Sequence, residues 1–341
     1  MLNLRQTHIP GVSIIRRLGV LTCLLLALTV ATKPSVAAEQ QFPDQPLHFI
    51  VPYGVGGGPD SLTRMISQYL GKKWGQATVA ENRPGASGVI GFGVASRAKP
   101  DGYTVLFADS TIVAINPHLR PQMTGGKDVF QIFAPLTLAA TAPMLLVVSP
   151  KFKAKSLSEL IALVKSQPGK FSYGTPGSGT PQHIAMELLM RETGMQMVHV
   201  PFGSVQAAAP SLISGDIAMM FATTTPVLGL LQSGGLRAIA AGGSERLAGV
   251  PNVPTFAGAG LPNFKATINF GYLIPAGTPE KTVQKLQVAI AAALKTPEAS
   301  KWLAAQGMQG VGSSPQSFEA ISRTESEDYG RVIKAAGIKV D

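Results

Sequence analysis

Short apolar runs alternate with segments whose apolar residues recur at helical spacing along most of the chain. The short runs predict strands at 47–52, 77–81, 103–108, 143–149, 171–174, 196–200, 216–221, 236–241 and 268–274. The helical spacing predicts helices at 60–73, 88–97, 156–166, 181–193, 204–214, 279–295, 297–306 and 315–336. Such alternation is typical of α/β proteins with largely parallel sheets, so the pattern predicts an α/β fold class.

Two segments rich in proline and small residues, 135–143 and 253–262, are candidate crossings between two lobes. On this division, residues 39–139 and 259–341 form a discontinuous first lobe, and residues 140–258 form the second. The pattern alone does not force that discontinuous arrangement.

The first 38 residues have the three parts of an export signal. A basic start precedes an apolar run at 18–31, and small residues then lead to a cleavage position after Ala38. The apolar run is short for a membrane span, which takes about 20 residues. We therefore expect a periplasmic protein, exported by either the Sec or the twin-arginine route. Cys23 is the only cysteine and would leave with the signal.

The charge distribution argues against nucleic-acid binding. The chain has 29 Lys and Arg residues against 19 Asp and Glu, but the basic residues are scattered and only 6% of all residues are aromatic. A nucleic-acid surface needs clustered basic residues and rings for stacking. The positive balance favours an anionic ligand only weakly.

A glycine-rich turn, GVGGG at 54–58, separates the first predicted strand from its helix. Asp60 is expected to cap that helix, and free amides at a helix N-terminus favour an anion. An ordinary strand-to-helix turn explains the glycines equally well, and Pro59 excludes the G-x-G-x-x-G nucleotide fingerprint. The candidate ligand contacts are the backbone amides of Val55, Gly56, Gly57 and Gly58.

A second strand, glycine turn and helix follow at 171–189. The turn would present amides and two hydroxyls at the start of the helix, and a histidine falls in the first helical turn. The candidate ligand residues are Ser178, Gly179, Thr180 and His183. A cap-region role explains His183 equally well. One such loop from each lobe would clamp a carboxylate.

Other candidates follow other predicted strands. Ser110 and Thr111 come directly after the strand at 103–108, and open α/β sheets bind ligands at the carboxyl ends of their strands. Phe202 would wall the pocket, although core packing explains this residue equally well.

Enzyme motifs are missing from the sequence. It has no G-x-S-x-G and no H-E-x-x-H, and its histidines show no metal-ligand spacing. Ser178 and His183 are too close at a helix start to make a nucleophile–base pair with an orienting acid. We therefore expect no catalytic residue, metal or cofactor, and a secreted α/β enzyme remains the alternative class.

Ordered segments along the chain carry a family resemblance: VPYGVGGGPDSLTR (51–64), ENRPGASGVIG (81–91), KPDGYTVLFAD (99–109), YGTPGSGTPQH (173–183), GDIAMMF (215–221), PNVPTFAGAGLP (251–262) and IPAGTPEKTVQKL (274–286). Together they resemble the Bug receptors, the extracytoplasmic solute-binding proteins of tripartite tricarboxylate transporters. The resemblance implies a two-lobe periplasmic-binding-protein fold, of the type II-like Venus flytrap kind, with a ligand cleft between the lobes. It also implies that the loop at 53–60, which starts at Tyr53, holds a ligand carboxylate through backbone groups and ordered waters.

The chain departs from the family pattern at positions that bear on the ligand. Ala222 stands where members often carry an acidic residue, so the resemblance disfavours an amino-acid ligand. The threonine run that starts at Thr223 would instead hydrogen-bond hydroxyl or carboxylate oxygens. The implied function is a monomeric receptor that captures a small carboxylate for membrane transporter subunits. A sensor that signals to a membrane kinase would use the same cleft and stays open.

Overall fold

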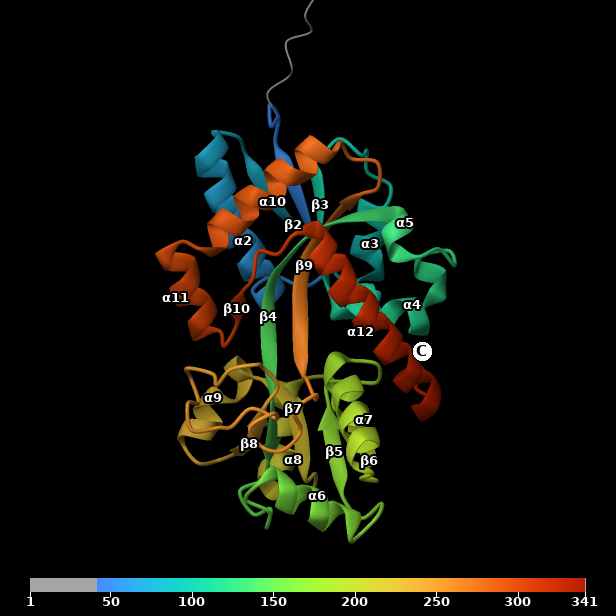
Figure 1. The fold of residues 1–341 in the computed structure, drawn as a ribbon, viewed down its shortest axis with the longest axis vertical. Coiled ribbons are helices and arrows are strands. Elements are labelled where there is room, and N and C mark those ends of the chain that lie inside the picture. The colour runs from blue at the N-terminus through green and yellow to red at the C-terminus, as the bar shows by residue number, and fades with distance from the viewer. Residues whose placement is uncertain (1–41, 341) are drawn as a thin grey trace, which may run out of the picture. The chain divides into compact units, whose positions relative to one another are not determined.

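The computed structural model describes residues 42–340, so the export signal predicted at 1–38 lies outside the described residues. The description below concerns Gln45–Asp341, which forms a compact unit of its own. Its strands form one hydrogen-bonded sheet whose path runs β2-β1-β3-β9-β4-β7-β5-β6, with β8 and β10 both paired to β4. Figure 1 shows the strands running through this unit with helices packed around them.

Parallel pairs build the part of the sheet that carries the first glycine loop. β1 (Leu47–Val51) lies between β2 (Thr78–Asn82) and β3 (Thr104–Asp109) and is parallel to both. β9 (Thr267–Pro275) continues the sheet antiparallel to β3. The carboxyl ends of the three parallel strands therefore meet at one edge, which is where ligands bind in open α/β sheets.

β4 (Phe133–Val148) belongs to both parts of the sheet. Its residues 133–143 pair with β9, and its residues 144–148 pair with β7 and β8. The parallel strand β5 then lies between β7 and β6. The remaining strands are β5 (Ser172–Thr175), β6 (Val198–Pro201), β7 (Met219–Thr223), β8 (Arg237–Ala241) and β10 (Gln309–Gly310).

The α/β class is confirmed, but the expectation of largely parallel sheets is wrong. β4 is antiparallel to β7, β8, β9 and β10, and β9 is antiparallel to β3. The two long strands β4 and β9 carry the chain in opposite directions through the middle of the sheet, which makes the sheet mixed. The lobe boundaries expected at 139/140 and 258/259 stay a prediction.

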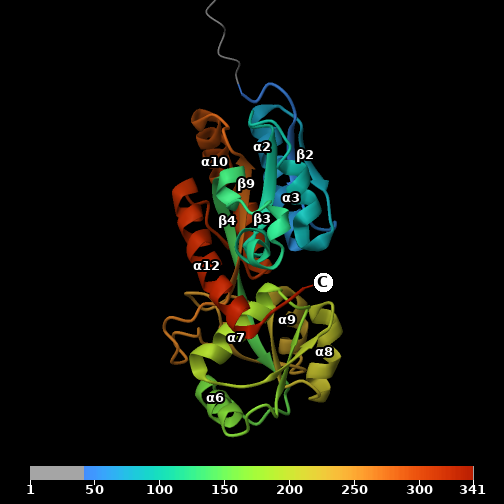
Figure 2. The same cartoon turned by 90° about the vertical axis from the view of Figure 1, so that its right-hand side faces the viewer.

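Helices surround the sheet, and α12 packs along β4 and reaches α7 (Figure 2). The longer helices are α2 (Gly58–Trp74), α3 (Val89–Ala95), α6 (Leu157–Lys165), α7 (Pro181–Thr193), α8 (Val205–Ser214), α9 (Thr224–Gln232), α10 (Glu280–Leu294), α11 (Pro297–Ala305) and α12 (Pro315–Ala336). Short turns of helix are η1 (Ala86–Gly88), η2 (Thr111–Ile115), α4 (Asn116–Leu119), η3 (Pro121–Met123) and α5 (Val129–Ile132). None of the described helices is long and apolar enough to cross a bilayer.

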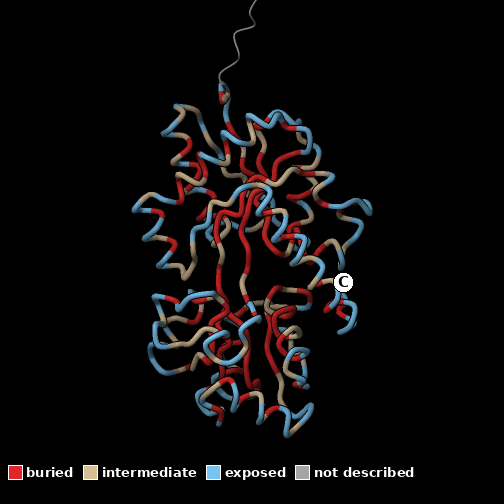
Figure 3. Tube along the Cα trace, viewed as in Figure 1, coloured by how far each residue is buried: buried red, intermediate tan, exposed pale blue. Residues whose placement is uncertain are grey.

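Buried residues follow the strands (Figure 3). One apolar cluster packs β3, β4 and β9 against α12 and includes Phe133 and Phe318. A second cluster packs β4 and β7 against α8 and includes Met220 and Leu212. β4 contributes to both clusters, so it links the two parts of the core.

Gly271 of β9 lies directly under the ring of Phe318 from α12. A methyl group at Gly271 would overlap this ring, which is 1% exposed and therefore confined by its neighbours. We expect Gly271→Ala to lower the free energy of unfolding by about 1–3 kcal/mol, the usual cost of overpacking a core. Denaturant unfolding tests this, with Gly229→Ala as the control because nothing lies within 4 Å of a methyl group there. Equal stability of Gly271→Ala and the parent would contradict this packing.

Candidate functional site

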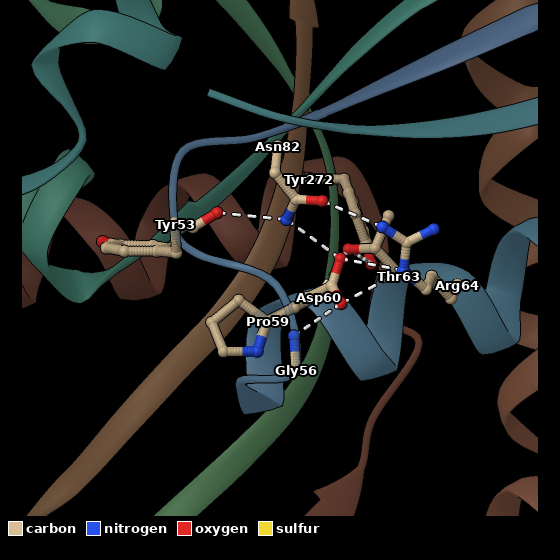
Figure 4. Close-up of polar contacts among 8 residues, drawn as sticks. All are labelled: Tyr53, Gly56, Pro59, Asp60, Thr63, Arg64, Asn82 and Tyr272. Carbon is tan, nitrogen blue, oxygen red and sulfur yellow. Dashed lines mark hydrogen bonds and ion pairs between the residues drawn. The ribbon is translucent and has the colours of Figure 1, made fainter. Parts of the chain in front are cut away.

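Asp60 anchors the first glycine loop (Figure 4). Its carboxylate accepts a hydrogen bond from the Gly56 amide at 2.9 Å, pairs with the Arg64 guanidinium at 3.0 Å and accepts from the Asn82 side-chain amide at 2.9 Å. The expectation that Asp60 caps the helix is wrong, because α2 begins at Gly58 and its N-cap is Gly57. The carboxylate reaches back to an amide ahead of the helix instead.

Asn82 extends this network to the start of the loop. Its side-chain amide also donates to the Tyr53 carbonyl at 3.0 Å, and its oxygen accepts from Arg64 at 2.9 Å. Burial opposes the ionisation of Asp60, but the hydrogen bonds from Arg64, Gly56 and Asn82 outweigh it and lower the pKa of this carboxyl. A charged, 2% exposed aspartate therefore holds Gly56 directly, and Asn82, which donates to the same carboxylate, holds the start of the loop at Tyr53.

Of the four amides predicted to contact a ligand, those of residues 55–58, the network uses one and leaves three available. Within the described chain, the amides of Val55, Gly57 and Gly58 donate to no protein acceptor. They lie at the N-terminal end of α2, a 17-residue helix whose dipole favours an anion there. A Cβ at Gly58 would lie 3.0 Å from the methyl carbon of Met308, so Met308 borders the loop.

Tyr53 ties the loop to the end of β3. Its hydroxyl donates to both oxygens of Asp109 at 2.8 Å, and Thr111 hydrogen-bonds to both side chains. Burial, with the charge of Asp109, raises the pKa of Tyr53 well above its ordinary value. Burial also raises the pKa of Asp109. The Tyr53 hydroxyl therefore serves to position the loop.

Ser110 uses its hydroxyl within the protein. The hydroxyl donates to Glu325 of α12 at 2.8 Å and accepts from the backbone amide of Asn269 at 3.0 Å. Ser110 is fully buried. It therefore joins the end of β3 to β9 and α12, and a ligand contact for it stays a prediction.

The second glycine loop is fixed by its own hydrogen bonds. The Gly179 amide donates to Nδ1 of His183 at 3.1 Å. Thr180 caps α7: its hydroxyl accepts from the His183 amide at 3.4 Å and donates to the Gly177 carbonyl at 2.8 Å. Ser178 is exposed. Of the four predicted residues of this loop, Ser178 alone has an exposed side chain.

His183 lies beneath the loop, at 5% exposure. Its ring stacks on that of His199 with 3.9 Å between centroids, and its Nε2 lies 3.7 Å from Glu187. Burial, with the neighbouring His183, lowers the pKa of His199 to about 4, so His199 is neutral at pH 7. A Cβ at Gly179 would lie 2.5 Å from Leu119 of α4, so the loop also packs against that helix. His183 thus supports the loop from inside.

Phe202 follows β6 and packs inward. Its amide donates to the Thr175 carbonyl at 2.9 Å, and its ring would lie 3.3 Å from a Cβ at Gly174. The ring packs against the second apolar cluster. Core packing therefore accounts for Phe202, and a role in walling the pocket stays a prediction.

The threonine run joins β7 to α9. Thr223 is the N-cap of α9 without a side-chain cap bond, and the Thr225 hydroxyl donates to the Gln306 carbonyl at 3.1 Å. Thr224 is 2% exposed, and its hydroxyl has no hydrogen-bond partner in the described chain. Gln306 is two residues from Met308, which borders the first glycine loop. A buried hydroxyl without a partner is costly unless something else pairs with it.

The structure therefore groups some predicted residues and separates others. Tyr53, Ser110 and Thr111 converge at the end of β3, whereas the second glycine loop packs against Leu119 of α4. Sequence reasoning missed Asn82, although it ends β2 at the same carboxyl edge as the loop, a position that could have singled it out. Among residues 42–340, no cluster of three His, Cys, Asp or Glu is placed to hold a metal ion.

The chain is similar to a known family of receptors, in both sequence and structure. The family model described as the tripartite tricarboxylate transporter family receptor matches residues 62–338. Protein BugT of Bordetella pertussis is 31% identical over 319 residues, which is 93% of this chain and 97% of BugT. The structure of R. palustris Rpa4515 with adipate has a TM-score of 0.73 and 29% identity, covering 87% of this chain and 99% of that one. The structure of MatC from Rhodopseudomonas palustris with bound malate has a TM-score of 0.70 and 28% identity, and the match covers 86% of this chain and 100% of that one.

These matches run through both parts of the sheet. The solved relatives are periplasmic binding proteins, so the expected periplasmic-binding-protein fold is confirmed. The expected class of function, a solute-binding receptor, is confirmed by the family model. The chain belongs to the tripartite tricarboxylate transporter family of receptors, whose members are periplasmic solute-binding proteins.

Proposed function

We propose that this chain is an exported receptor that captures a small carboxylate between its two glycine loops for a tripartite tricarboxylate-type transporter. The observation that carries the proposal is the set of three available amides at Val55, Gly57 and Gly58, held at the start of α2 by the Asp60 network. Amides at a helix N-terminus suit a carboxylate. Relatives were solved with adipate and with malate, which are both carboxylates.

The other end of the solute would meet Ser178 and the threonine run. Ser178 offers an exposed hydroxyl, and Thr224 has a buried hydroxyl without a protein partner. Each hydrogen bond to a charged carboxylate would contribute about 1.5–3 kcal/mol. Closure of the two lobes on the solute would exclude water and present a new surface to the transporter.

Three further expectations belong to this proposal. The segment 1–38 directs the chain to the periplasm and is cleaved after Ala38. The protein acts as a monomer and without catalysis. Ala222 is fully buried in the second apolar cluster and brings no charge to pair with an ammonium group, so amino acids are poor ligands.

A thermal-shift screen tests the proposal. The purified protein is heated with mono-, di- and tricarboxylates, aromatic acids and amino acids. A ligand at about 100 times its Kd stabilises the folded state by roughly 2.7 kcal/mol. A clear shift with a carboxylate class supports the proposal. A shift of the melting temperature with amino acids alone would contradict the inference from Ala222. No shift with any of the acids would contradict carboxylate capture.

Ser178→Ala is expected to weaken carboxylate binding at least tenfold, because it removes one hydrogen bond to a charged group. The apo stability should not change, since the side chain is exposed. Thr180→Ala is unsuitable for this test because Thr180 caps α7, and its loss would cost about 1 kcal/mol of stability. Calorimetric titration measures the affinity. An affinity equal to the parent's would remove Ser178 from the site.

Thr224→Val is expected to raise the apo free energy of unfolding by about 1 kcal/mol, because it removes a buried hydroxyl that has no partner. The same variant should bind the carboxylate more weakly, because the solute would be that missing partner. Denaturant unfolding and calorimetric titration measure the two effects. Higher stability with unchanged affinity would show that the hydroxyl does not reach the solute.

A further inference from the structure

A pocket separate from the glycine loops lies between α7, α12 and the start of β9. Its volume is about 620 Å³, within the usual range of small-molecule sites. Its apolar wall includes Leu188, Phe264 and Ile321, and the Ile321 side chain is 38% exposed. Its charged groups are Glu192 of α7, Lys265, and Glu325 and Asp328 of α12.

The pocket lies on the opposite face of β9 from α2. Successive residues of a strand point to opposite faces. Asn269 hydrogen-bonds to Glu325 and Gly271 lies under α12, whereas the Tyr272 hydroxyl is 3.0 Å from that of Thr63 in α2. Because α2 starts at the first glycine loop, β9 separates that loop's helix from the pocket.

Glu325 sits at the inner end of the pocket without a cationic partner. Its carboxyl accepts from the hydroxyls of Ser110 and Tyr329, both at 2.8 Å, and from the side-chain amide of Asn269 at 3.3 Å. These donors are neutral, and no ion pair to Glu325 occurs in the described chain. Burial raises the pKa of Glu325 to about 7, the hydrogen bonds oppose this, and the nearby Asp109 adds to it. A buried carboxylate of this kind is stabilised by a cation.

The remaining charges leave this end of the pocket negative. Asp328 already pairs with Arg331 on its own helix. Glu192 and Lys265 are both exposed, and their opposite charges cancel in the sum over the residues that line the pocket. On α12 itself, the titratable group that contacts the Glu325 carboxyl is the Tyr329 hydroxyl, which is a neutral donor.

We propose that this pocket binds an organic cation of the alkylammonium class. The ammonium group would pair with Glu325, with Glu192 at the rim, and the alkyl chain would pack on Leu188, Phe264 and Ile321. The site goes beyond the proposed carboxylate site and does not depend on it.

Calorimetric titration with n-butylammonium chloride tests the site, with 1-butanol as the uncharged probe of the same chain length. At pH 8 we expect the ammonium to bind and the alcohol not to bind. Glu325→Gln should weaken ammonium binding at least tenfold, whereas Glu327→Gln, an exposed residue of the same helix outside this pocket, should not change it. Equal affinity of Glu325→Gln and the parent, or equal binding of the two probes, would overturn the proposal.

The pH dependence gives a second readout. With a pKa of about 7, the ionised fraction of Glu325 falls from about nine tenths at pH 8 to about one tenth at pH 6. Affinity for n-butylammonium should therefore fall about tenfold over this range in the parent and stay flat in Glu325→Gln. Glu192→Gln, at the exposed rim, should weaken binding several-fold without affecting the fold. A flat profile in the parent would overturn the role of Glu325.

Discussion

Gly57→Val is expected to abolish carboxylate binding while leaving the fold intact. Gly57 has φ −75° and ψ 169°, an extended conformation open to any residue. A Cβ there would lie 3.7 Å from its nearest neighbour, the ring of Pro59. The backbone therefore accepts valine without strain, but the branched side chain would stand over the amides of Gly57 and Gly58. Losing two hydrogen bonds of about 1.5–3 kcal/mol each corresponds to more than about a hundredfold in Kd.

The control for this variant is Gly54→Val, which lies in the same loop. Nothing lies within 4 Å of a Cβ at Gly54, and its amide is not among the three proposed contacts. Calorimetric titration should give near-parent affinity for Gly54→Val and no measurable binding for Gly57→Val. Both variants should unfold cooperatively, with a slightly lower melting temperature for Gly57→Val because valine is a poorer N-cap than glycine. Tight binding by Gly57→Val would remove the loop from the site. Loss of binding in both variants would mean that the specific amides are not the cause.

The first glycine loop could be found in the sequence because its signal is local. The glycine-rich residues 54–58 stand between a short apolar run and a segment with helical spacing, and this pattern is enough to locate a strand-to-helix turn. Its anchor could not be found in the same way. Asp60 satisfies the local pattern of an N-cap, but the side chain turns back to Gly56 because Asn82, 22 residues away, lies beside it once β2 pairs with β1. That contact exists only in the folded sheet.

The pattern missed two elements for two different reasons, one non-local and one local. The strand predicted at 143–149 begins ten residues earlier, at Phe133. Proline and threonine interrupt the apolar run there, so the sequence pattern does not show a strand. The strand forms because β9 supplies its hydrogen-bond partners. α9 has no predicted counterpart because its sequence, TTPVLGLLQ, contains proline and glycine. Helices with strong caps and regular periods, such as 181–193 and 315–336, coincide with α7 and α12.

His183 shows the same limit at the level of a single side chain. Its position in the first turn of α7 is readable from the sequence, but the direction of its ring is not. The ring stacks on His199 of β6, and its Nδ1 accepts the Gly179 amide. A residue that looked like a ligand donor is therefore engaged in holding the loop, because strand β6 packs beside the helix.

Glu325 is expected to make the parent protein less stable as the pH rises from about 4.5 to 8. Its pKa is raised from the ordinary 4.5 to about 7, chiefly by burial. A carboxyl with a raised native pKa binds its proton more tightly in the folded state. Its contribution to stability is therefore complete below about pH 4.5 and is lost as the pH rises through 7. The difference between the two pKa values corresponds to about 3 kcal/mol.

Comparing the parent with Glu325→Gln isolates this effect, because other titrating groups cancel in the difference. Glutamine keeps an oxygen that can accept from Ser110 and Tyr329, and it does not ionise. Denaturant unfolding at pH 5 and pH 8 should show the variant gaining about 2.5 kcal/mol on the parent between the two values. Glu327→Gln should run parallel to the parent, since that side chain is exposed. A constant difference between the parent and Glu325→Gln would mean that Glu325 is ionised in the native state throughout. The contact between β3, β9 and α12 would then contain a permanently charged carboxylate, and its contribution to the free energy of unfolding would not depend on pH.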